Sequence, residues 1–124
     1  MSNARAFFDA GSGALLWCSC EGWDDWGQPV DLELLPISQA LRDELDRLIS
    51  RYDTSLNWDY PPDPGPWREA ECLEFNEAVR SAITQLRAEL GPTWQIRDHT
   101  GEQHEDPDLD RYQADPAGFR RDQP

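Results

Sequence analysis

The sequence contains no lysine, so its basic side chains are 11 arginines, which face 25 acidic residues and leave a formal net charge of −14. A charge of this sign and size repels nucleic acid and anionic membrane surfaces. Long apolar runs are also missing, since no stretch approaches the ~20 residues that span a bilayer. No basic and apolar leader opens the chain. These absences predict a soluble cytoplasmic protein that binds neither nucleic acid nor membrane.

Cysteine and histidine are scarce. Three cysteines, Cys18, Cys20 and Cys72, make an odd number, which excludes a simple disulfide framework. The two histidines, His99 and His104, lie in a charged stretch near the C-terminus. No metal-protease helix, nucleophile elbow or glycine-rich phosphate loop is present. We therefore predict no catalytic residue, cofactor or metal, and interpret the thiols as small buried hydrophobic groups, with a zinc site as the less favoured alternative.

Hydrophobic periodicity predicts an α+β fold in which three strands precede two helices and one last strand. The strands are expected over residues 5–10, 14–20, 30–34 and 93–97, and the helices over 38–53 and 67–90. Ser38 is the expected N-cap of the first helix, and Gly91 followed by Pro92 ends the second. We expect a small antiparallel sheet with both helices packed on one face.

The chain divides by composition near residue 97. Residues 1–97 are expected to form a single α+β domain. Residues 98–124 contain eight acidic residues, three prolines and little apolar periodicity. Such a composition is typical of disorder, so we expect an acidic tail that is disordered or loosely attached.

Six tryptophans stand out against this polar background, because indole rings are costly to leave in water unless they pack in a core or bind a partner. The segment Trp23, Asp24, Asp25 and Trp26 places two carboxylates between two indoles on an expected loop. Charge and cation–π contacts there suit a guanidinium or ammonium group. The alternative is that one ring folds over the sheet while both acids face water.

A second segment, residues 57–67, repeats this chemistry among four prolines. Prolines restrict the loop, so aromatic side chains there bind with little ordering cost. We predict that Asp59 and Tyr60 bind a partner, while Trp67, which opens a helix, covers the core. For Trp58, partner binding and covering of the core both stay open.

Several short runs resemble a group of short acidic proteins of actinobacteria that carry no assigned activity. The resemblance covers roughly residues 14–97 and lies in Leu35-Pro36-Ile37-Ser38, Arg51-Tyr52-Asp53, Asn57-Trp58-Asp59, Phe75-Asn76 and Leu90-Gly91-Pro92. These are core and loop residues, so the resemblance implies a fold and an origin, and it implies no mechanism.

Acidity and aromatic loops together favour a non-enzymatic binding protein. We predict that it neutralises a basic protein partner such as a toxin domain, in the manner of an immunity protein or antitoxin, because acidic surfaces with aromatic anchors complement basic clefts. A hydrolase that uses paired carboxylates, or a structural interaction subunit, are the alternatives.

Overall fold

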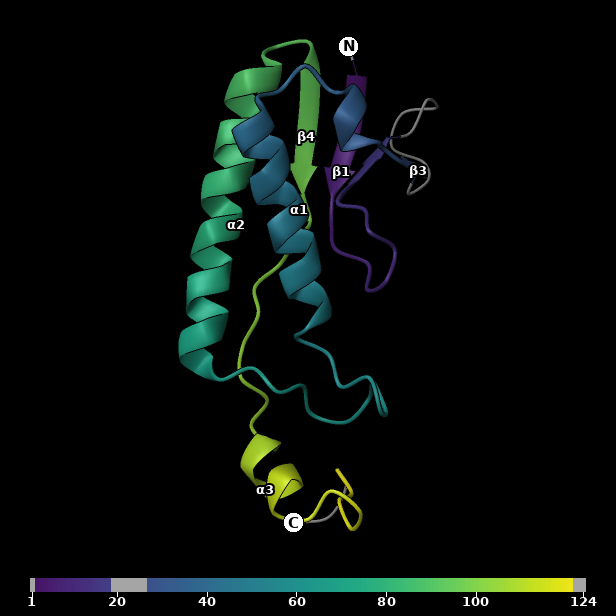
Figure 1. Cartoon of the computed structure of the whole chain (residues 1–124), viewed down its shortest axis with the longest axis vertical. Coiled ribbons are helices and arrows are strands. Elements are labelled where there is room, and N and C mark those ends of the chain that lie inside the picture. Colours follow the sequence, from purple (N-terminus) through teal and green to yellow (C-terminus); the bar gives the residue numbers. More distant parts are fainter. Residues whose placement is uncertain (1, 19–26, 122–124) are drawn as a thin grey trace.

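The structure is a computed structural model that describes residues 2–18 and 27–121. Within these ranges, four short strands form one sheet in the order β3-β2-β1-β4. The strands are β1 (Ser2–Ala6), β2 (Leu16–Cys18), β3 (Gln28–Pro29) and β4 (Trp94–Asp98). The helices are η1 (Leu32–Leu34), α1 (Gln39–Asp53), α2 (Glu69–Leu90) and α3 (Leu109–Ala114). Figure 1 shows α1 and α2 side by side, with α3 at the far end of the molecule.

The α+β class is confirmed, and the sheet is mixed. β1 pairs antiparallel with β2, and β2 pairs antiparallel with β3, as expected. β4 instead lies parallel to β1, with Ala4 opposite Ile96. The reason is the connection: the chain runs down α1 and back along α2, so it enters β4 in the direction of β1 (Figure 1). Parallel strands need a long crossover of this kind.

Both long helices begin and end where local chemistry favours it. Ser38 caps α1, since its Oγ accepts the Leu41 N–H at 3.2 Å. Gly91 follows α2 with φ of 76°, a left-handed conformation that glycine adopts without a Cβ clash. The expected ends at Asp53 and Leu90 are therefore confirmed, and α2 begins at Glu69, two residues later than expected.

The core lies between the helices and one face of the sheet. Ala4 and Ala6 of β1 are fully buried, and these small side chains let the helices approach the sheet closely. Both predicted helical stripes supply most of the remaining core: Leu41, Leu45, Leu48 and Ile49 from α1, and Cys72, Phe75, Val79, Ile83, Leu86 and Leu90 from α2. Ile96 completes the layer from β4.

The predicted strand over residues 30–34 is wrong. Asp31 instead caps the 3-10 helix η1 by accepting the Glu33 N–H at 3.0 Å. This local side-chain bond competes with strand pairing. The burial pattern agrees, since Leu32 and Leu35 are buried three residues apart whereas Leu34 is 82% exposed. An alternating sequence was thus compatible with either structure.

The first strand lies earlier than predicted, at Ser2–Ala6 instead of residues 5–10. Beyond it, two neighbouring rings pack in different places. Phe7 stacks on Trp17 with ring centroids 4.8 Å apart, and Phe8 stacks on Tyr52 of α1 at 4.7 Å. Ring packing therefore explains the apolar residues that suggested a longer strand.

The buried faces of α1 and α2 predict large losses on truncation. Ile83→Ala and Leu45→Ala should each lower the free energy of unfolding by about 2–5 kcal/mol, because each leaves a cavity in a close-packed layer. Urea unfolding of the full chain measures this. Leu73→Ala is the matched control, since Leu73 lies on α2 but is 55% exposed. Equal effects at all three positions would contradict the packing.

Candidate partner-binding surface

The proline-rich loop (residues 54–68) joins α1 to α2 and is held in shape by its own polar groups. The Asn57 side-chain oxygen accepts the N–H groups of Asp59 and Tyr60 at 3.1 and 3.2 Å. Its amide nitrogen donates to the Pro64 carbonyl at 3.3 Å. Gly65 lies so near Ser55 that an added Cβ would be 2.0 Å from the Ser55 carbonyl oxygen. These contacts therefore hold the loop in a defined conformation.

The loop presents two exposed aromatic rings and buries a third. Trp58 and Tyr60 are each 59% exposed. Trp58 is fixed by its indole N–H, which donates to the Asp53 carbonyl at 2.6 Å. Trp67 is buried, donates to Thr54 Oγ1 at 3.0 Å and lies edge-on to Phe75. The core-covering role predicted for Trp67 thus agrees with its burial.

The C-terminal segment (residues 99–121) lies along α2, where the sequence predicts a loosely attached tail. Asn76 is buried on α2, and its amide donates to the Gln103 carbonyl at 2.8 Å while accepting the Gln103 N–H at 2.7 Å. Arg80 pairs with Glu102 at 3.1 Å one turn away. These contacts run antiparallel to α2 and lead the segment toward the proline-rich loop.

The same segment caps the start of α2. Arg68, at the N-cap position, makes no side-chain cap bond. Glu105 supplies that bond, because its carboxylate accepts the Glu69 N–H at 3.1 Å. The Glu69 carboxylate accepts the Glu105 N–H at 3.0 Å in return. This bond, together with His104, holds the pKa of Glu69 below its usual value. These two neighbouring carboxyls therefore cap the start of α2 and hold the C-terminal segment against it.

The segment ends in a small cluster beside the loop. Leu109 and Phe119 are buried, and the Tyr112 and Phe119 rings meet edge to face at 5.4 Å. Arg121 donates to the Pro62 carbonyl at 2.9 Å and to Asp106 at 2.8 Å. The guanidinium lowers the pKa of Asp106. Arg121 therefore ties the proline-rich loop to the C-terminal segment.

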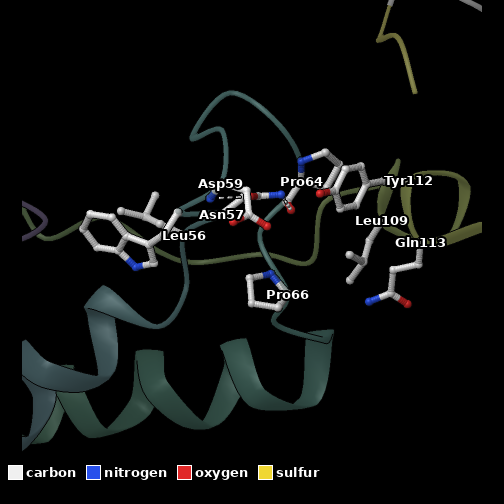
Figure 2. A pocket seen from close by; sticks show the side chains of 9 residues that line it. Leu56, Asn57, Asp59, Pro64, Pro66, Leu109, Tyr112 and Gln113 are labelled. Atoms are coloured by element: carbon white, nitrogen blue, oxygen red, sulfur yellow. Dashed lines mark hydrogen bonds between the residues drawn. The ribbon is translucent and has the colours of Figure 1, made fainter. Parts of the chain in front are cut away.

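A pocket of about 310 Å³ opens between the loop and α3. Figure 2 shows Asn57, Asp59, Pro64 and Pro66 on the loop side, with Leu109, Tyr112 and Gln113 projecting from α3 across from them. Leu56 and Trp58 complete the lining. The lining thus combines apolar, aromatic and amide side chains with a single carboxylate.

Charge pairing separates the acids of this region into two groups. Every acid from residue 102 to 110 pairs with an arginine of the chain, and the closest pair joins Asp110 to Arg68 at 2.7 Å. In the loop, neither Asp59 nor Asp63 takes part in an ion pair with any described residue. Uncompensated negative charge of this region therefore lies on the loop, next to the exposed rings, and on Asp115 after α3.

The predicted site residues have different outcomes. Trp23, Asp24, Asp25 and Trp26 lie outside the described residues, as does Cys20, so the first aromatic–acid segment stays a prediction. Asp59 and Tyr60 are exposed, and their binding role stays a prediction. Asp59 lines the pocket together with Trp58, Tyr112 and Gln113, whereas Tyr60 is not among the lining residues. The helical spacing of Leu109 and Tyr112 was the one sequence signal for the α3 wall.

Residues 2–18 and 27–121 contain no group of three or more His, Cys, Asp or Glu side chains placed to hold a metal ion. None of their helices is long and apolar enough to cross a membrane. Cys72 is buried in the core, and burial raises the pKa of its thiol.

Comparison with known proteins identifies the family. A family model described as Serratia CdiI immunity protein-like matches residues 8–99. The chain belongs to this immunity protein-like family. The match includes the sheet from β2 onward, both long helices and the whole proline-rich loop, and it ends before α3. No curated protein matches the chain.

The contacts of the C-terminal segment predict that its removal destabilises the domain. Truncation after Asp98 leaves the buried Asn76 amide and the first turn of α2 without partners, which should lower the free energy of unfolding by at least about 2 kcal/mol. Urea unfolding measures this. The same truncation should cost less in an Asn76→Leu background, where no buried amide is left unpaired. Unchanged stability would instead support a loosely attached tail.

The lowered pKa of Asp106 predicts a pH dependence. Because this pKa is lower in the folded chain than in the unfolded one, its stabilisation is complete above the unfolded value of about 4. It is lost as the pH falls through the folded value. Asp106→Asn should therefore lower the melting temperature at pH 7 and converge with the wild type in acid. A gap that stays constant across the titration would contradict the Arg121 contact.

Proposed function

We propose that this protein binds and neutralises a toxin through an acidic, aromatic surface centred on the proline-rich loop, and that the toxin surface it covers is basic. Membership of an immunity protein-like family supports toxin binding as the function. The neighbouring carboxyl groups of the C-terminal segment cap α2 or pair with arginines. Such structural roles accord with a protein that acts by binding. The actinobacterial origin and the cytoplasmic location expected from the sequence belong to this proposal as well.

The single observation that carries the choice of surface is the pairing of exposed aromatics with uncompensated acids. Trp58 and Tyr60 are each 59% exposed. Tryptophan and tyrosine are the residues most often responsible for binding energy at interfaces. Asp59 lies between them in sequence and has no ion pair among the described residues. Rings supply desolvated contact area, and free carboxylates attract a basic partner over long range.

Preformed geometry adds to the argument. The Asn57 bonds, the Trp58 bond to Asp53 and the Arg121 bond to Pro62 hold the loop before any partner arrives. Side chains that are already fixed lose little entropy on binding. The segment Trp23 to Trp26 enters the proposal from sequence alone, as a second contact region with the same chemistry.

A different surface offers the matched comparison. Leu34 of η1 is 82% exposed and lies next to Glu33, and Asp46 of α1 lines the same side of the molecule. This patch combines apolar and acidic groups but has no aromatic ring among its described residues. It therefore serves to separate a specific loop interface from a general attraction to negative charge.

The first experiment identifies the toxin. The tagged full chain captures partners from its native host, and each captured protein is then expressed alone and together with this chain. A true toxin should stop growth alone and lose that effect in the presence of this protein. Growth arrest that this chain does not relieve would contradict the proposed function, even if the two proteins bind.

Variants then locate the interface by titration at low and high salt. Trp58→Ala should raise the Kd about thirtyfold, mainly by faster dissociation, because an anchoring aromatic contributes about 2 kcal/mol or more. Asp59→Asn should slow association about two- to fivefold and weaken its salt dependence. Leu34→Ala and Asp46→Asn should change neither. The reverse result, with losses only at Leu34 and Asp46, would place the interface on η1 instead.

A further inference from the structure

We propose, on the basis of the toxin-binding function above, that the pocket between the proline-rich loop and α3 receives one basic side chain of the toxin. The C-terminal segment would then help to decide which toxin is bound. The pocket is lined by one carboxylate, Asp59, and by no arginine or histidine. Its remaining polar groups are the side-chain amides of Asn57 and Gln113.

The lining matches the two parts of a basic side chain. Leu56, Pro64, Pro66 and Leu109 offer apolar walls for an aliphatic stem, and long basic residues bury such stems while their charged heads stay near water. Trp58 and Tyr112 place aromatic rings in the lining, which suit a cationic head, and Asp59 offers opposite charge. An acidic or phosphate group would find no counter-charge there.

The size of the pocket favours a single side chain. Its volume is about 310 Å³, at the lower end of the ~300–1,000 Å³ found for pockets that enclose small molecules. Trp58, one of the two exposed rings of the proposed interface, is among its lining residues. A residue at the centre of a protein interface reaches such a pocket while the surrounding rings exclude water.

The α3 wall is held in place from the start of α2. Arg68, directly before α2, donates to Asp110 at 2.7 Å and to Gln113 Oε1 at 2.9 Å. Leu109 is buried behind the pocket. The wall is therefore formed before binding, and Arg68 ties it to the start of α2.

The wall also belongs to a part of the chain beyond the family match. The match covers residues 8–99, so the loop side of the pocket lies inside it and the α3 side lies outside it. A protein distinguishes related partners by the difference between their binding energies. A pocket completed by residues outside the shared fold gives this chain a way to recognise one toxin among relatives.

Gln113 allows a test with opposite expected signs. Its side chain is exposed at the pocket edge. In the full chain, Gln113→Glu should lower the Kd for the captured toxin, and Gln113→Arg should raise it, each about two- to fivefold at low salt. Because Gln113 accepts from Arg68, a merely structural role would change the melting temperature of each variant together with its Kd. Melting temperatures of all variants report whether the fold is kept.

Matched charge changes on β4 provide the control. Gln95 is exposed in the edge strand β4, which lies toward the opposite end of the molecule from α3 (Figure 1). Gln95→Glu and Gln95→Arg alter the net charge identically, so they should leave the Kd almost unchanged. Equal shifts at both positions would show a general charge effect and would overturn the pocket assignment.

Substitutions in the toxin complete the test. Each arginine and lysine of the captured toxin is changed to alanine, and every variant is titrated against the Gln113→Glu and Gln113→Arg chains. One basic residue should remove the difference between the two chains, which is the signature of direct coupling. If none does, the pocket does not hold a basic side chain. That outcome leaves neutralisation intact, whereas a chain that neutralises no toxin would overturn both proposals.

Discussion

The arrangement of the candidate surface depends on one buried amide. Asn76 is the buried polar side chain in the described part of the core, and both of its hydrogen bonds go to the backbone of Gln103. A buried amide without partners costs about 1–3 kcal/mol, so the chain after β4 is held against α2 at this point. From there the path to Glu105, α3 and Arg121 follows. The α3 wall of the pocket is therefore positioned by a contact in the middle of α2.

Arginine usage explains how so acidic a chain folds. Arg68, Arg80 and Arg121 each connect α2 or the C-terminal segment to acids that are distant in sequence. Exposed pairs of this kind contribute little individually. Their effect here is on position, because the planar guanidinium of Arg121 bonds a carbonyl and two carboxylates at once. The arginines pair with the acids from residue 102 to 110, whereas Asp59 and Asp63 have no ion pair with any described residue.

The sequence predicted those elements that rest on periodic burial. The stripes of α1 and α2, the Ser38 cap and the Gly91 end all follow from local chemistry, and the structure confirms them. Residues 30–34 were mistaken for a strand because alternation does not reveal the Asp31 cap. The docking of residues 99–121 was not predictable, since its contacts are polar and long-range and leave no periodic signal.

The candidate surface was partly predictable for the same reason. Composition marked Asp59 and Tyr60 as exposed and chemically unusual, and both are exposed. It did not reveal that Trp58 is anchored to Asp53, or that Tyr112 and Gln113 lie across from it. The first fact depends on the fold of the loop against α1, and the second depends on where α3 lies, and so on Asn76 and Arg68. A sequence pattern indicates which chemical groups a segment carries. Contact between two segments that are distant in sequence becomes apparent only in the folded structure.

The negative charge that the ion pairs leave uncompensated favours the proposed binding of a basic partner. A net charge of −14 on 124 residues opposes the compact state through self-repulsion. The ion pairs of the C-terminal segment relieve part of that repulsion within the chain, but within residues 2–18 and 27–121 no arginine pairs with Asp59 or Asp63. A basic partner at the proline-rich loop would supply the missing positive charge where the fold leaves it uncompensated. Because binding to the folded state alone stabilises that state, the same acids that strain the free protein would favour the complex.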